Sequence, residues 1–186
     1  MKVLSFVLTG AVCSMLFFSA CATGSKVAQV STDVQPVKSV QTVQAEQTIK
    51  NASIAQNIIN FGAVKGKVWQ LGKVLDQSDA IIFNASKLDP KKFSDIYTIQ
   101  FNDSTASGKA APNRYTAPFV LGEDDMLSFQ TAASTMMMGI HTPDGLTETE
   151  FYKLLAQSER WSIEKDHFFI YTSDGHILVF NEFDGK

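Results

Sequence analysis

The chain has 186 residues, of which 45% are hydrophobic and 19% charged, with a formal net charge of −3 at neutral pH. This composition is typical of a globular protein with one core and argues against collagen-like, wholly disordered and multi-span membrane proteins. The charge gives no basic footprint, so we expect no nucleic-acid partner. Aromatic residues occur only before residue 19 and from Phe61 onward, so folding is expected to begin near residue 61.

Residues 1–20 have the features of a signal peptide. A short basic start precedes the apolar run Val3–Phe18, which is shorter than the roughly 20 residues of a membrane-spanning helix. The sequence Leu16-Phe17-Phe18-Ser19-Ala20-Cys21 resembles a bacterial lipobox, with Phe18 where the pattern prefers Leu. We expect cleavage before Cys21 and lipidation of this residue, with palmitate among the attached acyl groups. The alternative is an ordinary signal peptide with a chance cysteine.

Cysteine usage then defines how the protein is held together and where it lies. Cys13 leaves with the leader and Cys21 carries lipid, so no disulfide forms and the exported domain depends on its apolar core. Two or three acyl chains on one cysteine anchor a protein stably to a membrane. In bacterial lipoproteins, an Asp directly after the lipidated cysteine favours retention at the inner membrane, and this chain has Ala22 at that position. We therefore expect the periplasmic face of the outer membrane.

Residues 21–60 are interpreted as the lipidated cysteine and a flexible tether. The segment after Gly24 is rich in Val, Gln, Ser, Thr and Ala and has no aromatic residue before Phe61. Valines recur every three or four residues between Val27 and Val43, so an amphipathic helix that binds a partner is the alternative. Pro36 and the β-branched crowding argue against it. Ile49–Ile59 is the part most expected to be helical.

Five runs in residues 61–186 are rich in β-branched and aromatic residues and are bounded by Gly, Asn, Asp or Pro, which predicts strands. They are Val68–Leu71, Ala80–Phe83, Tyr97–Phe101, Tyr115–Leu121 and Met126–Phe129. Alternation along the first run predicts that Trp69 and Leu71 face the core. The acidic run 123–125 is interpreted as a solvated hairpin tip, because its spacing does not match a calcium loop. We expect no metal and no cofactor.

One helix is signalled clearly. Thr147 and Glu150 form a capping box, and Leu146 before the cap can pack against Phe151. The apolar positions that follow share one face of the helix, which is expected to cover the core. They are Phe151, Leu154 and Leu155.

The C-terminal hairpin carries two histidines beside acidic residues. A two-residue turn at Asp174-Gly175 would place Thr172 opposite Ile177 and leave His167 and His176 roughly 20 Å apart, too far to share a metal. In this register Phe168, Ile170, Ile177 and Val179 share one face, and Phe169, Tyr171, Leu178 and Phe180 share the other. Two apolar faces predict a second layer of structure.

Catalytic patterns are weak. Ser162 and Lys165 have Ser-x-x-Lys spacing, but residues three apart on a strand face opposite sides. His141 adjoins a Pro-Asp-Gly turn. The sequence contains no nucleophile-elbow pattern, no Gly-rich phosphate loop and no cysteine in the domain, so we expect no catalytic residue and no enzyme.

Several motifs occur in a fixed order, namely Trp69-Gln70-Leu71, Tyr97–Phe101, Asn113-Arg114-Tyr115, Ser134–Met137, Glu148–Leu155 and the closing hairpin. Together they cover about residues 64–183 and resemble a META domain of the HslJ-like bacterial lipoproteins. Pro112 and Gly139 stand where that family has cysteines, so no thiol role is carried over. The expected organisation is a signal peptide at 1–20, a lipidated tether at 21–60 and a META-like domain at 61–186.

The resemblance implies an α+β, mostly β fold: a strongly curved antiparallel sheet or cracked barrel of about eight strands, with one helix packed against its opening. Members of the family are associated with envelope stress and novobiocin resistance, and the fold is similar to a pilotin that binds lipid. We therefore expect a non-catalytic envelope lipoprotein that presents a β-rich module for envelope or stress-related protein contacts. The membrane, through the lipid anchor, and an envelope protein are the expected partners.

The alternative is a carrier for an acyl chain or lipid. Asn113, Tyr115 and Met136, Met137 and Met138 would line its ligand site, because methionine adapts to irregular apolar ligands. Against this, three consecutive residues of a strand cannot all face one cavity, and Asn beside a turn commonly bonds local backbone. A pocket of several hundred cubic ångströms lined by these residues would favour the carrier, whereas a filled core would favour the interaction module.

Overall fold

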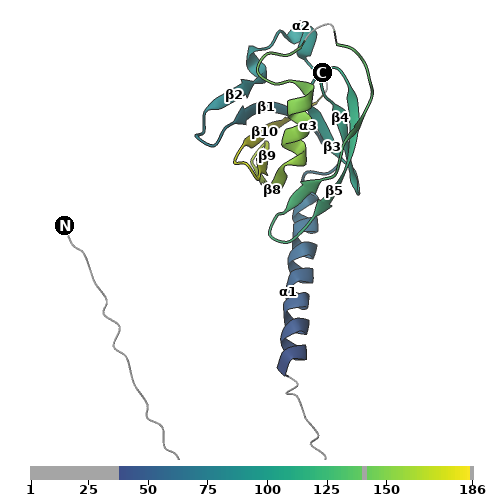
Figure 1. Cartoon of the computed structure of the whole chain (residues 1–186), viewed down its shortest axis with the longest axis vertical. Helices are drawn as coiled ribbons and strands as arrows, with labels where there is room; N and C mark the ends of the chain where they lie inside the picture. Colours follow the sequence, from purple (N-terminus) through teal and green to yellow (C-terminus); the bar gives the residue numbers. More distant parts are fainter. Residues whose placement is uncertain (1–37, 140–141, 185–186) are drawn as a thin grey trace, which may run out of the picture. The chain divides into compact units, whose positions relative to one another are not determined.

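The computed structural model describes residues 38–139 and 142–184 (Figure 1). The predicted signal peptide, Cys21, the tether up to residue 37 and His141 lie outside these residues, and the predictions on them stay predictions. The described part contains three α-helices, α1 (Lys38–Phe61), α2 (Pro90–Phe93) and α3 (Glu148–Ala156), and a single 3-10 turn at Ala85–Lys87. None of these helices is long and apolar enough to cross a membrane.

Ten strands form one antiparallel system. They are β1 (Val68–Leu75), β2 (Ile81–Asn84), β3 (Thr98–Phe101), β4 (Thr105–Lys109), β5 (Arg114–Leu121), β6 (Leu127–Phe129), β7 (Ala133–Ser134), β8 (Ser158–Glu164), β9 (His167–Thr172) and β10 (Ile177–Glu182). All five predicted runs fall on strands. The sequence analysis missed β4 and β7, because small and polar residues form them. In β4, Gly108 lies so close to β3 that a Cβ there would be 1.9 Å from the carbonyl oxygen of Thr98.

Eight of the strands follow one another as a nearly closed barrel, in the order β6-β5-β4-β3-β1-β10-β9-β8. The two outermost strands, β6 and β8, meet at a seam with few hydrogen bonds: Trp161 N donates to Asp125 O at 3.1 Å, and Met126 pairs with Arg160 as an isolated bridge. The predicted cracked barrel of about eight strands is therefore confirmed.

Aromatic side chains fill the barrel. Phe61 lies at the centre, with its ring centroid 4.9 Å from both Phe101 and Trp161. Phe168 packs 5.5 Å from Phe101 and 5.5 Å from Trp69. Trp69 is fully buried, as is nearly all of Leu71, which confirms that this face of β1 points to the core. The Trp69 indole is also satisfied, since its Nε1 donates to Val64 O at 3.0 Å.

The helix α1 differs from the predicted flexible tether. It is continuous from Lys38 to Phe61, so Ile49–Ile59 is helical as expected, but the helix also includes eleven earlier residues, 38 to 48. The apolar face used for the prediction is turned to solvent, with Ile49 and Ile59 about 70% exposed. The helix instead contacts the barrel through Asn57 and Phe61, which are both buried.

The predicted helix at Thr147 is present as α3. The Thr147 side chain accepts a hydrogen bond from Glu150 N, and the Glu150 carboxylate accepts one from Thr147 N at 2.7 Å, which confirms the capping box. Phe151, Leu154 and Leu155 are buried as predicted. In the view of Figure 1, α3 lies between the strands β8 to β10 and the strands β3 to β5. The Tyr97 ring packs 4.9 Å from Phe151 and joins α3 to the barrel core.

The predicted register of the last hairpin is wrong by one residue. Thr172 N donates to His176 O, so three residues, 173–175, form the loop between this bonded pair, and Gly175 adopts a φ of +83°. Tyr171 therefore pairs with Ile177. Since a slip of one residue exchanges the faces of a strand, the true inner face is formed by Phe168, Ile170, Leu178 and Phe180, which are fully buried. The outer residues Phe169, Tyr171, Ile177 and Val179 are half-buried.

Candidate functional site

The three consecutive methionines follow the short strand β7 at one end of the barrel. Met136 and Met138 are 98% and 97% exposed, and Met137 is 62% exposed. They do not line the barrel interior. Exposed large apolar side chains that stand together mark a surface for contacts more often than scattered ones do.

Asn113 fixes the backbone of this segment. Its Oδ1 accepts hydrogen bonds from Met137 N at 2.6 Å and from the Thr135 hydroxyl at 2.9 Å. Its Nδ2 donates to the Glu148 carboxylate at 2.7 Å and to Met137 O at 3.3 Å. Glu148 also accepts a hydrogen bond from Asn113 N at 3.0 Å, so the first turn of α3 is tied to the same residue. Asn113 is 95% buried, and its polar atoms hold the protein's own chain.

Tyr115 is buried in the core, although its backbone pairs with Ser134, two residues before Met136. Its hydroxyl donates to Thr98 O at 2.9 Å, and its ring packs against Phe151 and Tyr152. Complete burial, with a smaller effect of Tyr152, raises the pKa of Tyr115 well above its ordinary value, so this hydroxyl stays protonated. The structure therefore brings Asn113 and Met137 together, while Tyr115 serves the packing between β5 and α3.

A hollow of about 280 Å³ lies beside Met138. Its walls are mainly apolar, with two lysines, and are formed by Lys92, Phe93, Ile96, Lys109, Ala111, Pro112, Met138 and Gly139. This volume is slightly below the range of typical small-molecule sites, about 300 to 1,000 Å³. Of the five residues predicted to line a ligand site, only Met138 contributes to the hollow.

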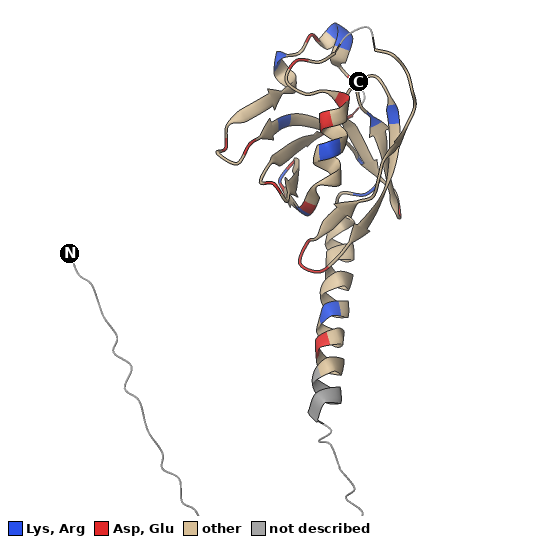
Figure 2. Ribbon diagram, in the orientation of Figure 1, with Lys and Arg blue, Asp and Glu red and all other residues tan. Residues whose placement is uncertain are grey.

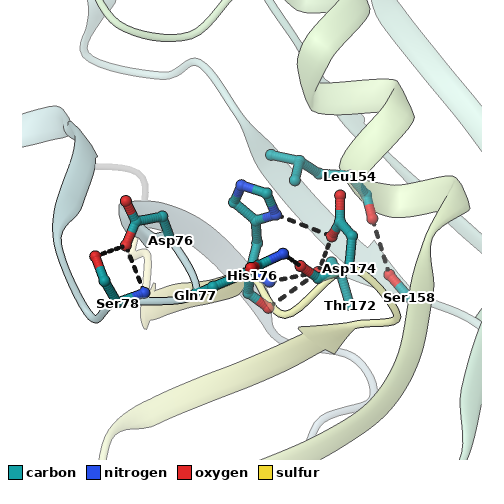
Figure 3. A network of polar contacts seen from close by, with 8 residues as sticks. All are labelled: Asp76, Gln77, Ser78, Leu154, Ser158, Thr172, Asp174 and His176. Carbon is teal, nitrogen blue, oxygen red and sulfur yellow. Dashed lines mark hydrogen bonds and ion pairs between the residues drawn. The ribbon is translucent and has the colours of Figure 1, made fainter.

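The cluster with the most acid–base character lies at the β9–β10 loop (Figure 3). Asp174 accepts a hydrogen bond from the Thr172 hydroxyl at 2.6 Å and pairs with His176 Nδ1 at 2.9 Å. These two contacts, with Thr172 the larger, lower the pKa of Asp174 to about 2. The Ser158 hydroxyl nearby donates to Leu154 O, so within the described residues the cluster lacks the serine–imidazole contact of a catalytic triad.

The β1–β2 loop contacts the β9–β10 loop. The Asp76 carboxylate closes the β1–β2 loop by accepting hydrogen bonds from Ser78 N, the Ser78 hydroxyl and Ala80 N, which lower its pKa. The Gln77 side-chain amide, in the β1–β2 loop, donates a hydrogen bond to the carbonyl oxygen of Asp174 in the β9–β10 loop. The polar groups of Figure 3 thus hold two turns together.

Asn57 joins α1 to the barrel seam and was not predicted from the sequence. Its Nδ2 donates to Gly122 O at 2.9 Å and to Met126 O at 3.0 Å, on the β5–β6 side of the seam. Its Oδ1 accepts a hydrogen bond from Trp161 Nε1 at 2.9 Å, on the β8 side. No local pattern marks one asparagine among the polar residues of this segment, so the role of Asn57 is visible only in the folded protein.

Further contacts join α1 to the acidic tip of the β5–β6 hairpin. Ser53 donates to the Asp124 carboxylate at 3.0 Å, and Lys50 lies 3.6 Å from Glu123. Asp124 and Asp125 both have positive φ, as in a tight turn. The tip that sequence analysis interpreted as solvated therefore also faces the helix.

The predicted lipidation residue, Cys21, lies outside the described residues, so its surroundings are not defined.

One family model and several solved structures are similar to this chain. A family model described as META domain matches residues 63–184. A protein from Burkholderia xenovorans, solved by NMR, is similar in structure with a TM-score of 0.54 and 21% identity, over 70% of this chain and 88% of that one. A DUF4847 family protein from Bacteroides vulgatus aligns with a TM-score of 0.46 and 13% identity, over 68% of this chain and 99% of its own. None of the curated proteins matches the sequence.

Proposed function

Because this chain belongs to the META domain family, we propose that it is a non-catalytic lipoprotein of the cell envelope, which presents its β-barrel for contacts with other envelope proteins. The observation that carries this proposal is the filled interior of the barrel. Phe61, Phe101, Trp161 and Phe168 occupy the space that a ligand would need. A module with a filled core acts through its surface.

The polar groups support a non-catalytic role. The side chains of Asn113, Asp174 and His176 hold neighbouring segments of the chain. A catalytic group, in contrast, must keep a donor or acceptor directed at a substrate. The two phenols at the α3 interface, Tyr115 and Tyr152, have pKa values raised chiefly by burial, which suits hydrogen bonding in a core and not acid–base work at neutral pH.

Membrane attachment in this proposal rests on the lipobox-like sequence that ends at Cys21. With Ala22 after the cysteine, the periplasmic face of the outer membrane is the location we propose. The helix α1 supplies a stiff spacer between the anchor and the barrel. Among the described residues, its contacts with the barrel begin at Lys50, so residues 38–49 extend beyond them by about 18 Å at 1.5 Å per residue, and Asn57 and Phe61 fasten the other end of the helix to the barrel. A spacer of this kind presents a module away from a membrane. An envelope stress response is the setting that the family resemblance suggests.

The carrier of an acyl chain or lipid is the second candidate, and the hollow beside Met138 is the observation in its favour. This hollow of about 280 Å³ has mostly apolar walls. However, it lies outside the barrel, and neither Asn113 nor Tyr115 lines it. We therefore rank the carrier below the interaction module.

Replacement of the proposed lipid attachment atom tests the anchor. In cells fed radiolabelled palmitate, the parent protein should incorporate label and sediment with membranes. Cys21→Ser should lose the label and accumulate as an uncleaved or soluble form, whereas Cys13→Ser, a cysteine inside the leader, should behave like the parent. Unchanged labelling of Cys21→Ser would refute the lipoprotein assignment.

A further inference from the structure

The exposed methionines, the hollow beside them and the surrounding cations form one surface, which we call the Met surface. It consists of Met136, Met138, the hollow, Lys91, Lys92, Lys109 and Arg114. Lys109 and Arg114 are cross-strand neighbours on β4 and β5, and Thr135, just before the methionines, bonds to Arg114 O through its backbone N–H at 3.0 Å. Met138, Lys92 and Lys109 line the same hollow, so the apolar and the basic groups adjoin each other.

The methionine side chains are presented by a fixed backbone. Met137 is bonded at both its N–H and its carbonyl to Asn113, which is 95% buried and also tied to α3. Met136 and Met138 flank this fixed point and stand almost wholly in solvent. A segment anchored in this way needs little ordering when it binds, which favours affinity. Methionine side chains adapt to the shape of a partner.

The cations determine which partner fits. Lys109 Nζ lies 2.7 Å from the Asp95 carboxylate, and Lys92 lies 3.8 Å from Asp89. Lys91 and Arg114 make no ion pair with any described residue. Figure 2 shows the lysines of α2 at the end of the barrel far from α1. Positive charge around an apolar centre is complementary to an apolar group with acidic flanks.

We propose that the Met surface binds a protein segment in which a large apolar side chain is flanked by aspartate or glutamate. This inference rests on the proposed function, because it assigns the surface through which the module contacts other envelope proteins. An anionic bilayer fits less well: each basic residue near such a membrane contributes about 1 kcal/mol, and only two of the four cations lack an ion pair with a described residue. An acidic peptide meets the same cations but can add an apolar side chain that enters the hollow.

Selection from a phage-displayed library of random 12-residue peptides tests the proposal. The full chain, purified as cells produce it, is held in phosphatidylcholine nanodiscs, and phage that bind empty nanodiscs are removed. The expected consensus is Leu, Phe or Trp with acidic neighbours. The double variant Met136→Ser with Met138→Ser should bind the selected peptide roughly tenfold more weakly, and the double variant Lys92→Glu with Arg114→Glu should also weaken it.

Val120→Ser is the matched control, because Val120 is an exposed apolar residue near the other end of β5. It should leave peptide affinity unchanged, and all variants should keep the parent's urea midpoint. Absence of an acidic and apolar consensus, or equal binding by the methionine variant, would overturn the proposal. Binding to phosphatidylglycerol vesicles that depends on the methionines, without peptide binding, would overturn it in favour of a membrane. Failure of the lipid anchor would appear in the palmitate experiment; the unanchored chain would then be presented for selection without nanodiscs, so the two failures stay distinguishable.

Discussion

Replacing Asn57 by Ala should destabilise the whole barrel, although Asn57 lies in a helix that precedes the sheet. Asn57 holds both sides of the β6–β8 seam, through Gly122 O and Met126 O on one side and Trp161 Nε1 on the other. Alanine would leave the indole N–H of Trp161, a side chain that is 96% buried, without a partner. It would also remove two donors from the hairpin carbonyls.

The expected loss follows from these contacts. An unsatisfied buried donor costs about 1 to 3 kcal/mol, and each lost hydrogen bond adds about 1 kcal/mol or less. Met126 O keeps a second donor, the N–H of Gly122 at 3.1 Å, which reduces the total. A loss of about 3 kcal/mol is therefore expected. With a urea dependence of about 2 kcal/mol per molar, the midpoint should fall by about 1.5 M.

Urea unfolding followed by fluorescence of the two tryptophans is a direct assay, since Trp161 is itself a partner of Asn57. Gln56→Ala is the matched control. Gln56 is exposed and, among the described residues, its side chain bonds to Asn60 in the same helix alone, so the free energy of unfolding of this variant should change by less than about 0.5 kcal/mol. If Asn57→Ala and Gln56→Ala have the same midpoint, α1 is not fastened to the seam and the reasoning is wrong.

Three further predictions concern stability. A fragment of residues 61–186 should unfold at a lower urea concentration than a fragment of residues 38–186, because it lacks Asn57 and the helix that positions Phe61. Equal urea midpoints of the two fragments would place the boundary of the domain at residue 61. Trp69→Ala should lower the free energy of unfolding by about 3 to 5 kcal/mol, since Trp69 is fully buried, and an unchanged midpoint would show that it is not a core residue. Asp174→Asn should be destabilising at pH 7. Because the pKa of Asp174 falls from 3.8 to about 2 on folding, the stability it contributes is present above about pH 4 and is lost between pH 4 and 2. The difference in free energy of unfolding between the parent and Asp174→Asn should therefore shrink as the pH falls from 4 to 2. A difference that stays constant would contradict the role of the Asp174 carboxylate.

The features predicted correctly are those with a strong local cause. The capping box at Thr147 and the alternation around Trp69 act within a few residues, so both appear in the sequence. The strand β4 was not predicted because it contains Gly108, which has a low strand propensity. A glycine is required there because the backbone passes too close to Thr98 for a side chain. The register of the last hairpin depended on one extra loop residue, since Gly175 with positive φ closes a three-residue loop where two were assumed.

The candidate site was predicted less completely than the fold. Asn113 was noticed as a turn residue, but its hydrogen bonds reach Met137 and Glu148, which are 24 and 35 residues away. Likewise, Asn57 reaches Trp161 across 104 residues. Contacts of such separation depend on the topology of the barrel, and a single sequence contains no local signal for them. The basic residues of the Met surface are also dispersed, on α2, β4 and β5, and come together only on folding.

Intact-mass measurement of the protein, purified from membranes and sprayed under native conditions, shows whether a lipidated chain carries a barrel filled by its own side chains. We expect a chain that begins at Cys21, with a mass increase equal to its covalent acyl groups and no further bound molecule. A chain with an unmodified Cys21, or a second species heavier by one non-covalently bound lipid, would contradict this expectation.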